Sequence, residues 1–236
     1  MRSVFVTGPG SVEVREIEKP EAGPRDVLLR MRASGICGSD HMYISVGGIP
    51  PNQGRTPLGH EPAGEIVEVG AEVTGFQVGD HVVIDTMAFT DGLLGSGGDQ
   101  GGLNEYVVVR DAAPGRQLRV IPRDIPWEVA ALNEPMAVAL HAVNRLEPKT
   151  GDKIVIFGAG PIGLGALLGA KSKGAGHVVV VDLQQERLET ALRIGADAVI
   201  NSATEDVKER LLELHGRSVG GFLRDARPDT DGYIDA

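Results

Sequence analysis

The sequence contains a single cysteine, Cys37, among 236 residues, so an intramolecular disulfide is excluded. No apolar run approaches the roughly 18 residues that a membrane helix needs, and Met1 to Gly8 is typical of a strand and turn rather than of a signal peptide. Basic residues are dispersed and the net charge is −10, which disfavours nucleic acid and anionic membranes as partners. We therefore expect a cytoplasmic protein with a small neutral or cationic substrate.

The composition, 42% hydrophobic and 24% charged, predicts an ordinary globular chain with one large domain or two modest ones. Its first part contains short β-branched or alternating runs that are separated by Gly and Pro turns. This pattern predicts an antiparallel sheet that forms a partly open barrel. The expected strands are Ser3 to Thr7, Val12 to Ile17, Val27 to Ala33, Gly64 to Val69, His81 to Ile84 and Tyr106 to Val109.

Helical patterns begin after Pro122, over Trp127 to Asn133 and Met136 to Arg145. A linker at 148–152 then divides the chain into predicted domains 1–147 and 148–236. In the second domain, apolar strands alternate with helices, which is typical of a doubly wound parallel sheet. We expect strands at Ile154 to Phe157, His177 to Val181 and Ala198 to Ile200, and helices at Leu164 to Lys173, Gln184 to Ile194 and Glu205 to Leu214.

The end of the chain, 232–236, is typical of the start of a fourth parallel strand. A doubly wound sheet needs a second half to complete the cofactor crevice at its switch point. We therefore expect that the chain is the N-terminal portion of a longer protein, or else a gene product truncated inside its second domain, and that it is inactive or poorly soluble on its own.

A glycine-rich loop follows the first strand of the second domain and opens a helix. The G-x-G-x-x-G spacing alone is weak, but the strand before it, the helix after it and an acid about 20 residues later predict a dinucleotide site. That acid, Asp182, would repel a 2′-phosphate, which favours NAD over NADP. Arg187 is the only nearby cation, and a solvated helix position is its alternative role. The candidate cofactor residues are Gly158, Gly160, Pro161, Ile162, Gly163, Asp182 and Arg187.

Cys37 is followed 23 residues later by His60 and Glu61, so a thiolate, an imidazole and a carboxylate are available for a catalytic zinc ion. Asp40 is placed to orient the histidine. Glu134 is a second candidate oxygen ligand, because its neighbours are apolar. Taken alone, Cys37 could be a small buried apolar residue and His60 a core histidine whose hydrogen bonds are satisfied.

These motifs together resemble the zinc-dependent medium-chain alcohol dehydrogenases, and within them the sorbitol and threonine dehydrogenase branch, because Glu134 stands where many members have a second cysteine. The resemblance implies a GroES-like catalytic domain joined to a Rossmann domain, and reversible NAD-dependent oxidation of an alcohol at one zinc ion. It also implies Ser39 as the hydroxyl that receives the alcohol proton, His41 as a relay, and a homo-oligomer at full length. The motifs are Cys37 to Asp40, Gly59 to Glu61, Val78 to Val82, Gly101 to Tyr106, Asn133 to Pro135 and the glycine loop.

The sequence departs from this family in two places. The relay histidine usually lies one residue further from the cysteine than His41 does, where this chain has Met42. The stretch from Thr86 to Asp99, which holds four zinc-binding cysteines in many members, has none, so a structural zinc of that kind is excluded. A zinc-free reductase of the same superfold, or a fragment that binds zinc or part of the dinucleotide without turnover, are the alternative functions.

Overall fold

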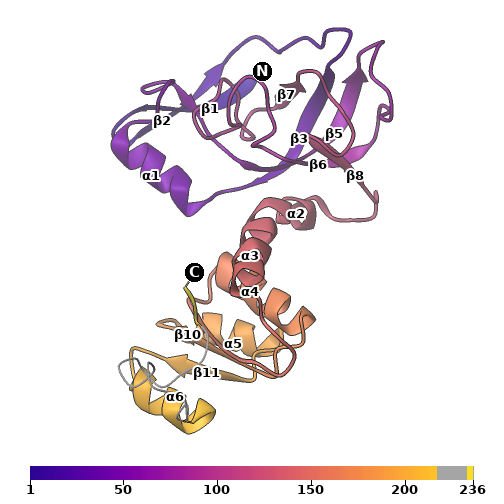
Figure 1. The fold of residues 1–236 in the computed structure, drawn as a ribbon. Helices are drawn as coiled ribbons and strands as arrows, with labels where there is room; N and C mark the ends of the chain where they lie inside the picture. The colour runs from indigo at the N-terminus through magenta and orange to yellow at the C-terminus, as the bar shows by residue number, and fades with distance from the viewer. Residues whose placement is uncertain (217–232, 236) are drawn as a thin grey trace. The chain divides into compact units, whose positions relative to one another are not determined.

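A computed structural model describes residues 1–216 and 233–235, which form two compact units, Met1–Glu134 and Pro135–Ala236. Helix α3 (Asn133–Leu146) begins at this division. The boundary expected from the sequence, at residue 147, lies at the other end of the same helix. Figure 1 shows the elements of both units, which are described here one at a time.

The first unit consists mainly of antiparallel strands in two sheets. One sheet has the order β2-β1-β4 and the other has the order β7-β3-β5-β6-β8. Among the described residues β7 and β8 each pair with one neighbour, so the larger sheet is antiparallel, as the sequence predicts, and does not close into a barrel. The strands are β1 (Arg2–Gly8), β2 (Ser11–Glu16), β3 (Val27–Gly35), β4 (Thr56–Pro57), β5 (Glu61–Val69), β6 (His81–Ile84), β7 (Tyr106–Val109) and β8 (Leu118–Ile121).

The core of the larger sheet is built from β-branched and leucine side chains of neighbouring strands. Val27, Leu29, Ile66, Val82 and Val107 are fully buried and pack in one cluster. Side chains that alternate along each strand point to the same face, so this cluster fixes the register of the strands. The register matters for the site, because it places Gly35 of β3 opposite Glu61 of β5.

Three elements of this unit were not expected from the sequence. Helix α1 (Gly38–Val46) starts directly after Cys37, and Gly47 ends it in a left-handed conformation with φ +80°. Strand β4 has two residues and includes a proline, and β8 is a short edge strand whose central residues are exposed. Each is brief and has little apolar periodicity, so tertiary contacts rather than local pattern decide its structure.

The second unit contains a parallel sheet with the strand order β11-β10-β9-β12. Its strands are β9 (Lys153–Phe157), β10 (His177–Asp182), β11 (Ala198–Asn201) and β12 (Tyr233–Asp235). The helices are α4 (Pro161–Ser172), α5 (Gln185–Arg193) and α6 (Val207–His215), in addition to α3. The pairing of β12 with β9 bears out the fourth strand expected near the end of the chain, of which residues 232 and 236 lie outside the described residues.

Helices cover both faces of this sheet. On one face, buried residues of α3, α4 and α5 pack against Ile154, Ile156, Val178 and Val180. On the other face, Leu211 of α6 packs against the remaining strand side chains. Successive residues of each strand thus point to opposite faces of the sheet and pack into two separate cores. This explains the unbroken apolar runs and confirms a doubly wound arrangement.

Several helix boundaries differ from the expectation, most of all those of α2 (Trp127–Ala130), α3 and α4. Helix α4 begins at Pro161 rather than Leu164, because Gly160 is its N-cap and proline suits a first helical position. The short helix α2 precedes α3, and Pro135 lies in the first turn of α3. Within the described residues no helix combines the length and apolarity needed to cross a membrane.

Candidate metal and cofactor sites

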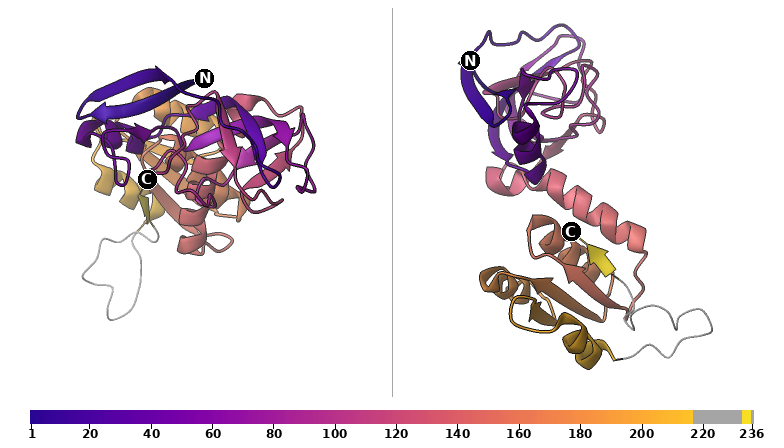
Figure 2. Two further views of the ribbon diagram at one scale, coloured as in Figure 1. Left: turned by 90° about the horizontal axis from the view of Figure 1, so that it is seen from above. Right: turned by 90° about the vertical axis from the view of Figure 1, so that its left-hand side faces the viewer.

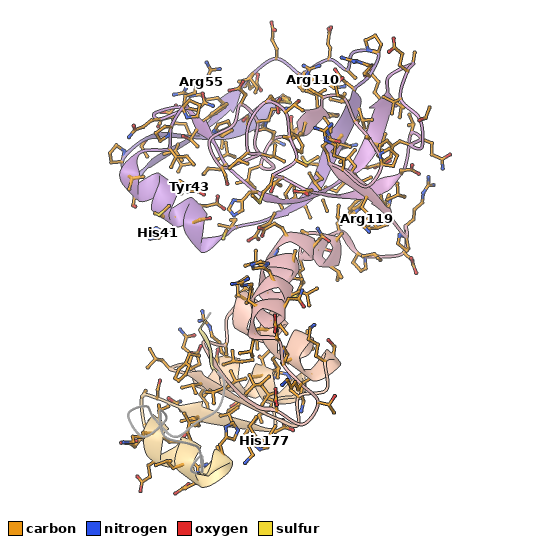
Figure 3. The ribbon with its side chains drawn as sticks, viewed as in Figure 1. His41, Tyr43, Arg55, Arg110, Arg119 and His177 are labelled. Carbon is orange, nitrogen blue, oxygen red and sulfur yellow. The ribbon has the colours of Figure 1, made fainter. Side chains whose placement is uncertain are left out.

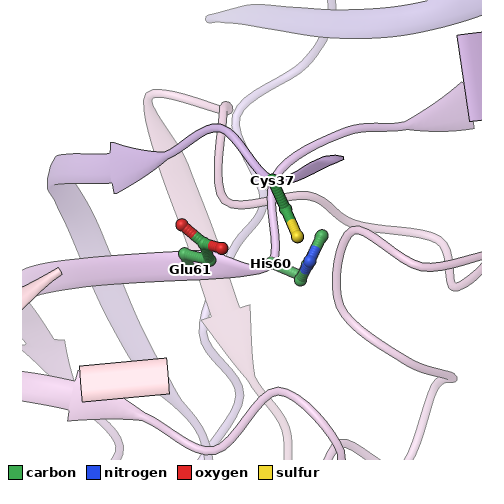
Figure 4. Close-up of side chains that lie close together, drawn as sticks. All are labelled: Cys37, His60 and Glu61. Carbon is green, nitrogen blue, oxygen red and sulfur yellow. The ribbon is translucent and has the colours of Figure 1, made fainter. Parts of the chain in front are cut away.

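The antiparallel pairing of β3 with β5 brings Cys37, His60 and Glu61 together. Gly35 at the end of β3 pairs with Glu61 at the start of β5, and Cys37 follows two residues later. One ligand atom from each of the three side chains lies within 4.8 Å of the others. Figure 4 shows the Cys37 sulfur beside the His60 ring and the Glu61 carboxylate on the neighbouring strand end. The structure therefore brings together three of the four candidate metal ligands that the sequence suggests.

Asp40 connects Cys37 to His60. Its Oδ2 accepts a hydrogen bond of 2.9 Å from the backbone N–H of Cys37, and its Oδ1 lies 3.4 Å from Nδ1 of His60. The buried Asp40 side chain stabilises the imidazolium, and with Cys37 it outweighs the effect of burial and raises the pKa of His60 to about 9. The orienting role expected for Asp40 agrees with this geometry. It leaves Nε2 as the His60 nitrogen available to a metal ion.

Glycines on the neighbouring strands allow this close approach. A Cβ atom at Gly35 would lie 1.9 Å from Oε2 of Glu61, so a larger residue at this position would displace that carboxylate. Gly59, directly before His60, has φ +94°, a conformation that side chains rarely adopt. Its carbonyl accepts a hydrogen bond of 2.7 Å from Gly102 N–H, which fixes the strand start against the 101–104 segment.

The other candidate residues of α1 lie at different distances from the cluster. Oγ of Ser39 is 3.2 Å from Nε2 of His60, so this hydroxyl lies beside the imidazole nitrogen that is the candidate metal ligand. His41 is exposed on the same helix, and Figure 3 labels it together with Tyr43. The Tyr43 ring centroid lies 6.4 Å from that of His60. A relay through His41 stays a prediction.

Glu134 is half-buried at the start of α3 and lies outside the three-residue cluster. Burial raises the pKa of its carboxyl, the charge of Glu61 adds to this effect, and the charge of His60 opposes it. The charges of His60 and Glu61 therefore both act on the Glu134 carboxyl. Which of the two glutamates completes a metal shell stays open.

The donor set fits zinc. A soft thiolate with an imidazole and a carboxylate is the combination that zinc takes in catalytic sites, with one further position left for water or substrate. Oδ1 of Asp40 and Nδ1 of His60 are buried, and neither atom has a hydrogen-bond partner among the described residues. They lie 3.4 Å apart, so Asp40 can hold the imidazole with Nε2 free for a metal ion. The residues present therefore suit one zinc ion.

The glycine loop joins the end of β9 to the start of α4 in a tight turn. Gly158 has φ +96° and donates a hydrogen bond of 2.7 Å to the carbonyl of Val181. A Cβ atom at Gly163 would lie 1.9 Å from the Gly158 carbonyl oxygen, whereas one at Gly160 would meet nothing within 4 Å. Gly163 therefore serves close packing, and Gly160 leaves open space at the helix N-terminus.

Asp182 at the end of β10 ties the loop to the sheet. Its Oδ2 accepts a hydrogen bond of 2.7 Å from Ala159 N–H and its Oδ1 one of 2.8 Å from Gln184 N–H. Partial burial opposes ionisation, but these bonds and the exposed Arg187 outweigh it and lower the pKa of Asp182. Asp182 is thus a fixed carboxylate beside the loop. Pro161 and Ile162 form the first turn of α4.

Comparison with known proteins identifies the family. The alcohol dehydrogenase GroES-like domain matches residues 23–116, and the zinc-binding dehydrogenase family matches residues 161–223. The crystal structure of 2R,3R-butanediol dehydrogenase from Bacillus subtilis superposes with a TM-score of 0.82 at 31% identity, over 100% of this chain and 77% of that one. The chain belongs to the zinc-dependent medium-chain dehydrogenase family.

Two curated members of this dehydrogenase family are similar at the sequence level. (R,R)-Butanediol dehydrogenase of Bacillus subtilis is 36% identical over 88% of this chain and 65% of its own length. Sorbitol dehydrogenase of Bos taurus is 36% identical over 91% of this chain and 64% of its own length. The chain thus spans about 64 to 65% of the length of these relatives.

Sequence reasoning missed the role of Gly35 in this medium-chain dehydrogenase. The residue looks like an ordinary strand end, and its contact with Glu61 depends on the register of β3 and β5. The only signal in the sequence is the small residue two positions before Cys37. It gains meaning once the pairing of the strands is known.

Proposed function

We propose that this medium-chain dehydrogenase oxidises a secondary alcohol, polyol or amino alcohol to the carbonyl compound, reversibly, with one zinc ion and NAD. The observation that carries the proposal is the convergence of Cys37, His60 and Glu61 within 4.8 Å. The similar butanediol and sorbitol dehydrogenases, which by name act on alcohols, support the substrate class. The net charge of −10 favours a small neutral or cationic substrate.

Cys37, Nε2 of His60 and Glu61 or Glu134 would hold the zinc, which when bound supplies Lewis acidity toward an alcohol oxygen. Asp40 holds the imidazole in one orientation through Nδ1. Ser39, 3.2 Å from Nε2, would accept the proton of the substrate O–H while it releases its own hydroxyl proton, and His41 on the exposed side of α1 would pass that proton to solvent.

The glycine loop would bind the dinucleotide. Backbone N–H groups at the start of α4 face the pyrophosphate, and the open space at Gly160 admits it. Asp182 keeps lone pairs for the adenosine ribose hydroxyls beside the two backbone hydrogen bonds it accepts. Its negative charge disfavours the 2′-phosphate of NADP, so NAD is the proposed cofactor.

The proposal is tested on a zinc-loaded full-length protein that contains this chain, with NAD⁺, by following NADH formation with 2,3-butanediol, sorbitol and L-threonine. We expect NADH with at least one alcohol, and loss of that activity in Cys37→Ala but not in Ser45→Ala, an exposed position on α1. Activity that survives Cys37→Ala would overturn the zinc mechanism.

A second candidate function is binding of zinc and dinucleotide without turnover. It is favoured by the coverage, because the chain spans about 64 to 65% of its curated relatives. Zinc and NAD binding by calorimetry, with no NADH from any alcohol, would favour this candidate and contradict oxidation by the chain. Hydride transfer requires that the reacting carbon and the nicotinamide be held close together in the correct orientation, whereas binding of zinc or of part of the dinucleotide does not.

A further inference from the structure

Strand β2 is an edge strand whose outer side is unpaired within the described residues. All six of its residues, Ser11–Glu16, are exposed, and β1 is its one described strand partner. Figure 2 shows the hairpin of β1 and β2 in indigo. An exposed edge of this length offers a row of backbone donors and acceptors to another strand.

The alternation of hydrogen-bonded and non-hydrogen-bonded pairs along the hairpin shows which backbone groups of β2 face outward. Met1 and Ile17 exchange backbone hydrogen bonds of 2.7 and 2.8 Å, so this pair is of the hydrogen-bonded kind. Because the two kinds of pair alternate, Arg15 and Glu13 are also bonded to β1. The N–H and C=O groups of Val12, Val14 and Glu16 therefore point away from the hairpin.

The side chains of β2 are complementary to those of a second, antiparallel copy. A two-fold axis at Val14 places Val14 opposite Val14 of the other copy, Val12 opposite Glu16, and Glu13 opposite Arg15. The Val14–Val14 and Val12–Glu16 pairs use the outward-facing backbone groups, and each of these pairs exchanges two backbone hydrogen bonds. Glu13 and Arg15 then form non-hydrogen-bonded pairs, in which side chains approach most closely.

Other symmetric registers are worse. An axis at Val12 pairs Glu13 with Ser11 and loses the charge pairs, and an axis at Glu16 brings two carboxylates face to face. A parallel arrangement in register sets Glu13 beside Glu13. Charged residues usually protect an edge strand against pairing, but here opposite charges two residues apart favour one register.

We infer that β2 is a self-association surface, through which two copies of this chain join their β2-β1-β4 sheets into one continuous sheet about a two-fold axis at Val14. Glu13 of each copy lies opposite Arg15 of the other, and this charge complementarity favours a second copy as the partner. Within each strand the same two residues form an ion pair of 2.8 Å. Val12 and Val14, 42% and 67% exposed, lie together on the opposite face of the new strand pair. The occupant of the edge is thus the same strand from another molecule.

The first test is the mass of the chain in solution, measured by sedimentation velocity over a range of concentrations. Val14→Pro removes an outward N–H that is not bonded to β1, so the hairpin is retained while the apparent mass falls by about half. Val14→Thr keeps that N–H and the branched shape, and we expect it to associate like the native chain. A native chain that stays monomeric, or an assembly that Val14→Pro leaves unchanged, would overturn the inference.

Charge reversal provides a second test that does not depend on the stability of one variant. Glu13→Arg and Arg15→Glu each set like charges opposite each other in a homodimer, so each alone should associate more weakly. Mixed together, the two variants pair arginines with glutamates at both positions, and the mass should recover. Failure of the mixture to recover, with both variants folded by circular dichroism, would show that another strand or surface is involved.

Discussion

Oδ1 of Asp40 lies 3.4 Å from Nδ1 of His60, while Oδ2 of the same carboxylate accepts the backbone N–H of Cys37 at 2.9 Å. One buried aspartate thus contacts two candidate metal ligands that are 23 residues apart in the sequence. It also places the first turn of α1, because Asp40 is the third residue of that helix. The metal site and the helix after Cys37 are therefore built as one unit.

Asp40→Ala should weaken zinc binding by about 10- to 100-fold, since partners that orient ligand histidines typically have effects of this size. Competition with a chromogenic chelator measures the change. Asp80→Ala is the matched control, because Asp80 is also buried and accepts a backbone N–H three residues before it, from Gln77 at 3.0 Å. A similar loss of zinc affinity in both variants would mean that Asp40 acts only through stability.

Gly35→Ala should displace the Glu61 carboxylate and lower zinc affinity by about tenfold or more. The reason is steric, because the added methyl group would lie 1.9 Å from Oε2 of Glu61. Gly8→Ala adds the same group at a position with nothing within 4 Å, and zinc affinity should be unchanged there. Native affinity in Gly35→Ala would indicate that Glu61 is not a ligand and would favour Glu134.

Two alanine substitutions in the glycine loop should separate folding from cofactor binding. Gly163→Ala should destabilise the second unit by about 1 to 3 kcal/mol, because its methyl group overlaps the Gly158 carbonyl oxygen. Gly160→Ala meets no atom within 4 Å and should change stability by no more than about 1 kcal/mol while weakening NAD binding. Thermal melts and calorimetric titration with NAD report the two effects. Unimpaired NAD binding in Gly160→Ala would contradict the placement of the pyrophosphate.

Acid should destabilise the second unit through His215 at the end of α6. Burial, with the nearby charges of His177 and Lys153, lowers the pKa of His215 from 6.5 to about 4. Between these values the unfolded chain binds the proton and the folded chain does not, so stability falls as pH falls from about 6.5 to about 4. Nδ1 of His177, labelled in Figure 3, lies 3.0 Å from Nε2 of His215.

Urea denaturation across this pH range measures the effect. His215→Gln removes the titrating group, so its stability should depend less steeply on pH than that of the native chain. Equal slopes for the two proteins would show that the histidine pair does not contribute to acid sensitivity.

The second unit was the easier part to predict from sequence. Its strands are buried on both faces, so Ile154 to Phe157 and His177 to Val181 stand out as apolar runs, and Gly158 to Gly163 marks the turn between them. Short elements such as α1 and β4 carry no comparable signal. Their positions depend on contacts with segments that are distant in the sequence.

The sequence singles out Cys37 and His60 as candidate ligands because few residue types can hold zinc and because Asp40 follows Cys37 by three residues, and the structure places the two side chains together. The space that Gly35 leaves for Glu61, and the hydrogen bond that holds Gly59, depend on strand register and could not be predicted from spacing alone. Which backbone groups of β2 face outward likewise depends on the hydrogen-bonding pattern of the hairpin and not on the sequence alone.

The most direct test of the zinc site is the zinc-to-protein ratio of the monodisperse chain after dialysis, measured by elemental analysis beside Cys37→Ala. We predict a ratio near one for the native chain and near zero for the variant, since Cys37 is the only thiolate available. A ratio near zero for the folded native chain, or a ratio near one that survives Cys37→Ala, would contradict the zinc site described by Cys37, His60 and Glu61.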